Sequence, residues 1–200
     1  MFQALQKTMW GPFLELIRPR ERLNDLAKQV ARLEDEAAVA EALNRYTYAY
    51  DASDLETLGN VFHPDCVVVN PRGTYRGRDL IKRNYEYLIS SRRFSFHFAM
   101  NVTVRIDPSG DSAGMSAYFQ DVSFLPSGGI KASGGTYVFR LAKTDGVWQF
   151  TEMRITNNYQ HRMAADSASD TGASLAPTDK APKPSGPDNT REWIGRDALA

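Results

Sequence analysis

Residues 94–106 read FSFHFAMNVTVRI, and this stretch decides the fold class. Large apolar residues hold every second position, and smaller or polar residues hold the positions between them. Since successive side chains of a strand point to opposite faces of its sheet, the alternation predicts a long β-strand with one apolar face.

His97 lies on the other face of this predicted strand, together with Ser95, Ala99 and Asn101. If helices cover that face, His97 belongs to the wall of a pocket. The alternative is a half-exposed or hydrogen-bonded sheet histidine without a chemical role. The alternation does not decide between a pocket residue and a sheet histidine without a chemical role. The helices could instead cover the phenylalanine face, and His97 would then point away from any pocket.

The residues around this strand predict three helices before it and a set of antiparallel strands after it. Apolar residues at helical spacing predict a first helix that ends near Asp51. A second helix is expected from a capping box at Ser53 and Glu56 to Phe62, and a third begins after Gly77. Helices followed by an antiparallel meander predict an α+β fold. The further strands are expected at 66–69, 112–125, 135–141 and 147–159.

Composition divides the 200 residues into three parts. Residues 1–32 are predicted to be a helical extension, with an apolar seam that packs either on its own domain or across an oligomer interface. Residues 33–162 are predicted to be the main domain. Residues 163–200 are rich in Pro, Ser and Ala and hold too few large apolar residues to offset the entropy of ordering the chain, so we expect a flexible tail.

Charge and motif content argue against several classes of function. The 24 basic and 24 acidic residues balance, so no global field attracts nucleic acid or anionic membranes. Cys66 is the single cysteine, and the three histidines are not arranged as metal ligands. Gly134 and Gly135 lack the ending of a phosphate-binding loop and are interpreted as loop or bulge glycines. Without a secretory signal or a run of about 20 apolar residues, we expect a cytoplasmic protein that binds no metal, nucleic acid or membrane.

The end of the first predicted helix carries a second candidate for chemistry. Tyr46 and Tyr50 lie one helical turn apart, and Asp51 falls at the helix C-terminus, where the helix dipole disfavours an acid. Asp51 is therefore either a solvated acid that begins the next turn, or a carboxylate that orients an imidazole and raises its basicity.

These features together give the chain a resemblance to the SnoaL-like branch of the nuclear transport factor 2 superfamily, over about residues 33–159. The resemblance implies a cone-shaped, curved sheet wrapped around the helices, a cystatin-like α+β barrel with one apolar pocket. The matching stretches are residues 45–54, 62–65, 75–77, 97–101 and 145–148.

Within that superfamily, the chain is similar to cofactor-free dehydratases and dehydrohalogenases, namely scytalone dehydratase, hexachlorocyclohexane dehydrochlorinase and the bile acid dehydratases. Those enzymes pair an Asp at the end of the first long helix with a His in the long strand, and Asp51 and His97 stand at these places. The bile acid enzymes add a Tyr and an acid, which Tyr46 and Asp121 match, and a late Arg, which Arg154 matches loosely.

The resemblance implies an elimination from a small to medium apolar molecule, aromatic or steroid-like, without a cofactor. His97, oriented by Asp51, removes a proton, and Tyr46 donates a hydrogen bond to the oxygen on which charge develops. Asp121, protonated in an apolar setting, or the imidazolium then protonates the departing hydroxyl. The expected substrate-binding residues are Tyr50, Phe119, Lys131, Arg140, Trp148 and Arg154. For the aromatic residues the alternative is a place in the core, and for the charged residues it is a solvated position on the surface.

Other functions fit the same residues. The pocket could serve a retro-aldol C–C lyase, an isomerase, or a polyketide-cyclase-like enzyme in which Asp121 is the main acid and base. A non-catalytic binding or assembly subunit is the alternative of another class. We also expect a homo-oligomer, a dimer or trimer, with the apolar stripe of residues 94–100 on the outer sheet face as a candidate interface.

Overall fold

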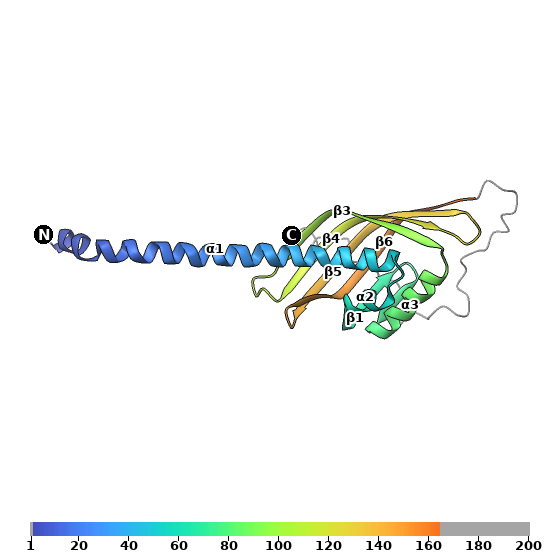
Figure 1. Ribbon diagram of the computed structural model, residues 1–200, viewed down its shortest axis with the longest axis horizontal. Helices are drawn as coiled ribbons and strands as arrows, with labels where there is room; N and C mark the ends of the chain where they lie inside the picture. Colours follow the sequence, from blue (N-terminus) through green and yellow to red (C-terminus); the bar gives the residue numbers. More distant parts are fainter. Residues whose placement is uncertain (1, 165–200) are drawn as a thin grey trace. The chain divides into compact units, whose positions relative to one another are not determined.

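The structure is a computed structural model that describes residues 2–164, with side chains from residue 19 on. Three helices and six strands form this part of the chain (Figure 1). Their order confirms the predicted α+β class. In sequence order they are α1 (Phe2–Asp51), α2 (Leu55–Asn60), β1 (Phe62–Asn70), β2 (Gly73–Arg76), α3 (Arg78–Ser90), β3 (Phe94–Ile106), β4 (Ser112–Phe124), β5 (Ile130–Thr144) and β6 (Val147–Met163).

The six strands form one sheet in the order β2-β1-β6-β5-β4-β3. All neighbours are antiparallel except β1 and β6, which pair in parallel. Strands β3 to β6 follow one another in a meander, so each is joined to the next by a short turn. The long strand predicted at residues 94–106 is present with these bounds and forms one edge of the sheet.

Contacts divide the chain after Ala37 into two compact units. In the first unit the side chains of the predicted apolar seam, from Leu23 to Leu33, are exposed. The two expected places for this seam, on its own domain or across an oligomer interface, stay predictions. The predicted tail at residues 163–200 lies outside the described residues from residue 165 on.

The core of the second unit forms between the end of α1 and the inner face of the sheet. Val39, Leu43 and Tyr46 lie on one face of α1 and are all buried. On β4 every second residue from Ala113 to Phe119 is buried, as expected for a strand with one face on a core. Each large apolar side chain removed from water contributes about 1.5–3 kcal/mol, so this packing fixes the end of α1 against the sheet.

The first turns and strands differ from the sequence prediction in their boundaries. The N-cap of α2 is Asp54 and not Ser53, because the Asp54 carboxylate accepts hydrogen bonds from the backbone N–H groups of Glu56 and Thr57 at 3.1 and 3.0 Å. Phe62 begins β1 instead of ending α2, since its backbone is held beside Phe150 of β6.

Strand β5 is longer than predicted and includes the two glycines that were interpreted as loop or bulge residues. The register between β5 and β6 shifts at these glycines, because Gly134 pairs with Tyr159 and Gly135 with Asn157, so the extra residue of the bulge is Asn158 on β6, opposite the two glycines. A Cβ atom on Gly135 would lie 1.8 Å from the carbonyl oxygen of Thr156. Only glycine fits this close approach of two backbones.

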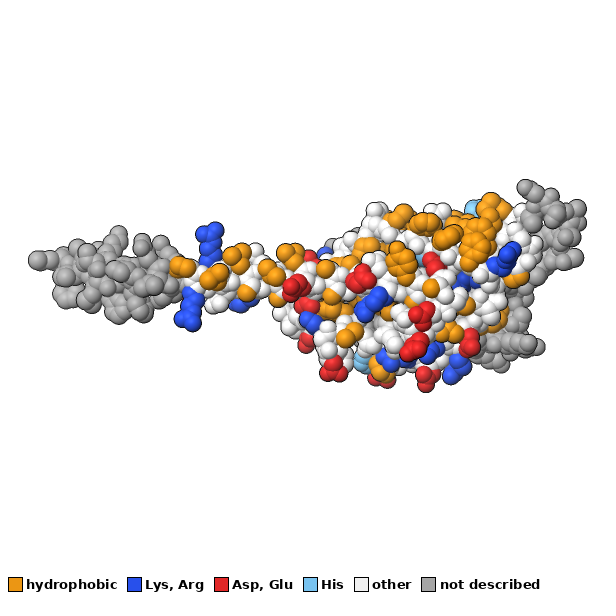
Figure 2. Space-filling view, in the orientation of Figure 1, with side chains coloured by type: hydrophobic (Ala, Val, Ile, Leu, Met, Phe, Trp, Pro, Cys, Tyr) orange, Lys and Arg blue, Asp and Glu red, His pale blue; other side chains and the backbone are white. Residues whose placement is uncertain are grey.

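The outer face of β3 carries the apolar stripe. Side chains of five residues on this face are between 42% and 52% exposed, and Figure 2 shows hydrophobic side chains gathered on the surface over this strand. The other face turns inward, with Ser95 buried. The helices therefore do not cover the phenylalanine face, and His97 points to the interior. The five exposed residues are Phe94, Phe96, Phe98, Met100 and Val102.

Candidate active site

Asp51 and His97 meet where the end of α1 touches the inner face of β3. Asp51 Oδ1 lies 2.6 Å from His97 Nδ1, and Asp51 Oδ2 accepts a hydrogen bond from the backbone N–H of His97 at 2.7 Å. Ser95 Oγ donates a third hydrogen bond, to Asp51 Oδ1, at 2.7 Å. The His97 side chain is only 7% exposed. The predicted contact between the two residues is thus present, and the carboxylate is held by three donors.

These hydrogen bonds decide which nitrogen of His97 is available for chemistry. Burial raises the pKa of Asp51, but the hydrogen bonds from His97 and Ser95 outweigh it, and the pKa lies below its ordinary value. An ionised carboxylate can only accept, so His97 donates from Nδ1. The lone pair of the neutral imidazole is therefore on Nε2, which is the arrangement of a general base.

Tyr50 and Arg92 complete one side of the pair. The Tyr50 ring lies edge to face with the His97 ring, with 4.6 Å between centroids. The Arg92 guanidinium lies 3.8 Å from the centroid of the Tyr50 ring, and Arg92 Nη2 donates to the Tyr50 carbonyl oxygen at 2.8 Å. A cation at the last turn of α1 stabilises the carbonyl end of the helix. It thereby offsets the unfavourable position of Asp51 in that turn.

Asp121 faces the other nitrogen of His97. It pairs with His97 in the register of β3 and β4, and its Oδ1 lies 3.7 Å from His97 Nε2, too far for a direct hydrogen bond. Its oxygens accept hydrogen bonds from Ser123 at 3.0 and 3.2 Å and from Ser133 at 3.1 Å. Lys131 Nζ lies 3.8 Å away.

The predicted apolar setting of Asp121 is therefore wrong. Of its polar neighbours, Ser123 lies two positions along the inner face of β4, whereas Ser133 and Lys131 lie on the adjacent strand β5, which sequence alternation on β4 does not reveal. Lys131, for which a solvated charge was the alternative, is part of this cluster. Burial lowers the pKa of Lys131, and the nearby Asp121 carboxylate opposes that effect.

Tyr46 lies deeper in the core than the predicted role requires. Its hydroxyl is 3.0 Å from the Tyr85 hydroxyl, and its ring packs edge-on against four aromatic rings with centroids between 5.9 and 6.2 Å away. Burial raises the pKa of Tyr46 to about 12. The hydroxyl is thus a neutral donor or acceptor within a tyrosine cluster, and its contact with a substrate stays a prediction.

Phe119 and Trp148 are both buried in the core. Phe119 stacks on Tyr137 with 4.2 Å between ring centroids. Trp148 pairs with Lys143 near the hairpin between β5 and β6. Core packing, which was the alternative for both residues, describes their surroundings.

Arg140 and Arg154 do not join the cluster around His97. Arg140 is nine positions along β5 from Lys131, about 30 Å in an extended strand, and its side chain is 59% exposed beside Glu152. Arg154 Nε and Nη2 bind Glu152 at 2.9 and 2.7 Å. Both arginines thus interact with the same carboxylate on β6.

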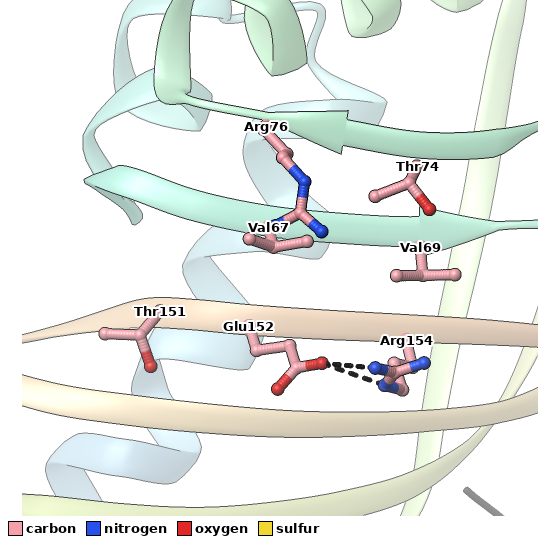
Figure 3. A pocket seen from close by; sticks show the side chains of 7 residues that line it. All are labelled: Val67, Val69, Thr74, Arg76, Thr151, Glu152 and Arg154. Carbon is pink, nitrogen blue, oxygen red and sulfur yellow. Dashed lines mark hydrogen bonds and ion pairs between the residues drawn. The ribbon is translucent and has the colours of Figure 1, made fainter. Parts of the chain in front are cut away.

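Arg154 lies on the opposite side of β6 from the buried Met153 and lines a separate pocket of about 260 Å³ (Figure 3). Side chains from β1, β2 and β6 form its wall. Because inward and outward residues alternate along a strand, this pocket is on the other face of the sheet from His97. Its lining residues are Val67, Val69, Thr74, Arg76, Thr151, Glu152 and Arg154.

Sequence reasoning missed four residues that hold the site together. Arg92 is in the turn between α3 and β3, and Ser95, Ser123 and Ser133 are on strands. The serines share one signal, because each lies two positions from another polar site residue on the same strand face. Arg92 has no comparable signal, since its partners on α1 are 42 residues away in sequence.

Among the described residues, no group of three or more His, Cys, Asp and Glu residues could hold a metal ion. Within residues 2–164, no helix is long and apolar enough to span a membrane.

Comparison with known proteins points to one domain family. The model of the SnoaL-like domain matches residues 31–154. No curated protein matches the chain significantly.

Solved structures share the fold at low sequence identity. A proposed aromatic ring hydroxylase from Novosphingobium aromaticivorans is 22% identical, with a TM-score of 0.61, over 66% of this chain and 94% of that one. A proposed scytalone dehydratase from the same organism is 21% identical, with a TM-score of 0.63, over 72% and 97%. A hexachlorocyclohexane dehydrochlorinase from Novosphingobium barchaimii is 18% identical, with a TM-score of 0.60, over 70% and 98%. At these identities the likeness shows a common fold.

Proposed function

Because the chain belongs to the SnoaL-like domain family, we propose that it is a lyase of the dehydratase type, which needs no cofactor and uses His97 as its general base. The observation that carries this proposal is the 2.6 Å contact between Asp51 and His97 Nδ1, which leaves Nε2 for a substrate. Two of the matched structures are named for eliminations, of water and of hydrogen chloride, and one for ring hydroxylation. A buried and oriented imidazole suits proton removal, so we favour elimination.

The proposed reaction begins when His97 Nε2 removes a proton from a carbon next to a carbonyl group or an unsaturated ring. The electron pair of that C–H bond forms the new double bond as the C–O bond to a hydroxyl breaks. The imidazolium then gives its proton to the departing oxygen, and water leaves. The Asp51 carboxylate faces the positive charge that the ring carries between the two steps.

We assign the second proton transfer to the imidazolium and not to Asp121. Both Asp121 oxygens accept hydrogen bonds from Ser123 or Ser133, so Asp121 is built into the site as an acceptor. Its carboxylate lies beyond Nε2, where it too faces the charge on the ring. A role for Tyr46 as donor to the substrate oxygen requires its hydroxyl to exchange Tyr85 for the substrate.

The proposed substrate is a small to medium apolar molecule, aromatic or steroid-like. A suitable probe is 4-hydroxy-4-phenylbutan-2-one, which has an acidic C–H group beside a carbonyl and loses water to form a conjugated ketone that absorbs ultraviolet light. Related β-hydroxy ketones with larger rings test the size limit.

The test compares the wild type with His97→Ala and Asp51→Asn. Loss of an oriented base costs about 10²–10⁴-fold in rate, so both variants lose turnover to this extent while circular dichroism stays unchanged. His161→Ala and Asp65→Asn are matched controls, because both side chains are exposed, and they keep full activity. Turnover that survives in the folded His97→Ala protein would refute the proposal.

A further inference from the structure

Arg92 is a buried cation whose bonding capacity is largely unused. The residue is 8% exposed, although an arginine is rarely buried without a partner. Nη2 donates to the Tyr50 carbonyl oxygen at 2.8 Å. Nε and Nη1 are also buried, and among the residues that the structure describes no atom accepts a hydrogen bond from them.

Such an arrangement is costly unless another group completes it. A buried donor without an acceptor loses the hydrogen bond that it would make to water, and the loss is larger when the donor carries a charge. Stacking on Tyr50 offsets part of this cost, because the face of an aromatic ring attracts a guanidinium cation. Neither the hydrogen bond nor the stacking to Tyr50 gives Nε or Nη1 an acceptor, so each of these nitrogens can donate to an acceptor that the folded chain does not itself supply.

Arg92 is beside the candidate active site. The same Tyr50 ring that it covers is in contact with the His97 ring at 4.6 Å. The positive charge of Arg92 also reaches Lys131, where it helps to lower the pKa of the ammonium group. Arg162 and Arg72 lower the pKa of Lys131 in the same way, so several cations lie within electrostatic reach of this ammonium group.

The charges of the cluster indicate which acceptor fits. The cations within electrostatic reach of Lys131 favour a ligand that carries negative charge. The neighbouring carboxylates of Asp51 and Asp121 repel a doubly charged phosphate more than a singly charged carboxylate. The Asp51 and Lys131 side chains keep 20% and 21% of their surface exposed, so the cluster is in contact with solvent.

From this geometry we infer that Arg92 binds a carboxylate group on the ligand of the His97 site, so that an apolar carboxylic acid is preferred as substrate over a neutral molecule. Arginine is suited to this task because its N–H groups match carboxylate oxygens in geometry. That the ligand is a substrate rests on the proposed function, whereas the binding of the carboxylate does not.

The first test needs only the wild-type protein and two probes of equal shape, benzoate and benzamide. Both carry the same ring, but only benzoate is charged. We expect benzoate to bind at least tenfold more tightly, and to shift the ¹⁵N–¹H signal of the Arg92 Nε–H group in a titration followed by NMR. Equal affinity for the two probes, or no shift of that signal with bound benzoate, overturns the inference. Phenyl phosphate that binds more tightly than benzoate overturns the choice of a single charge.

The second test uses Arg92→Gln, with Arg93→Gln as a matched control because the adjacent arginine is exposed. We expect Arg92→Gln to lose at least tenfold in benzoate affinity and Arg93→Gln to keep it. Unchanged binding in folded Arg92→Gln overturns the inference. If this variant does not fold, the wild-type comparison and the Nε–H signal decide.

The same probes separate this inference from the proposed function. His97→Ala retains Arg92, so benzoate binding persists in that variant whether or not the wild type is an enzyme. Benzoate binding by Arg92 in a protein without turnover would leave this inference standing and remove the proposed function. If the wild type turns over β-hydroxy ketones without any preference for a carboxylate, the proposed function stands and this inference is overturned.

Discussion

Replacing Ser95 with Ala removes one of three hydrogen bonds to the Asp51 carboxylate and leaves the other two in place. Ser95 is buried, and its hydroxyl donates to Asp51 Oδ1 at 2.7 Å, a short distance that is typical of a bond to a charged acceptor. Hydrogen bonds to charged groups contribute about 1.5–3 kcal/mol. We expect Ser95→Ala to lower the free energy of unfolding at pH 7 by this amount.

The loss should depend on pH in a defined direction. The pKa of Asp51 lies below its ordinary value of 3.8 in the folded protein, so its ionised form stabilises the fold. That stability is fully present above the unfolded pKa and is lost as the pH falls through the folded pKa. Without Ser95 the folded pKa is lowered less. The difference between wild type and variant is therefore largest above about pH 5 and shrinks below pH 4.

Urea unfolding at pH 7, 5 and 3 measures this difference directly. Ser90→Ala is a suitable control, since the Ser90 hydroxyl is exposed and binds only the carbonyl of Tyr87 on its own helix. The control should change stability by less than about 0.5 kcal/mol at every pH. A Ser95→Ala effect that is equally large at pH 3 and pH 7 would show that the hydroxyl does not stabilise the ionised carboxylate.

Two further predictions concern the scaffold. Gly135→Ala places a methyl group against a backbone carbonyl of β6, and we expect thermal unfolding to show that the free energy of unfolding falls by more than about 3 kcal/mol. Gly114→Ala is the control, because open space surrounds Gly114, and it should be neutral or stabilising by up to about 1 kcal/mol. Equal effects of the two substitutions would contradict the close approach of the two backbones. Burial raises the pKa of the Cys66 thiol to about 12, so a thiol reagent at pH 8 should label it only as fast as the protein unfolds, and rapid labelling of the folded protein would contradict its burial.

The sequence predicted β3 with its observed bounds because the period of two is a property of the strand itself. The prediction of a single apolar face was wrong after the register shift between Met100 and Thr103, because Val104 and Ile106 then pack on the core. It could not predict which face is buried, since alternation defines two faces without saying where the helices lie. The contact between Asp51 and His97 was expected only through the family resemblance. The structure supplies the missing reason, which is that the phenylalanines of β3 are exposed and His97 faces α1.

The setting of Asp121 and the role of Arg92 could not be found in this way. Asp121 is surrounded by groups that include Ser133 and Lys131 on the neighbouring strand, and the register between β4 and β5 decides which residues of β5 lie beside it. Arg92 contacts the end of α1 through a carbonyl group and an aromatic ring, and neither leaves a pattern in the sequence. The N-cap of α2 was predicted one residue too early for a simpler reason, which is that Ser53 and Asp54 are adjacent and both residue types are common helix caps.

The position of β3 at the edge of the sheet has a consequence for the behaviour of the protein in concentrated solution. An edge strand offers a row of backbone groups to any other extended chain, and apolar side chains on it make such pairing more favourable. The register of β3 shifts between Met100 and Thr103, where Asn101 has a φ of 53°, so the regular edge is interrupted there. Before this kink the Asp51 carboxylate already occupies the backbone N–H of His97, so the end of α1 protects that part of the edge against the addition of another strand.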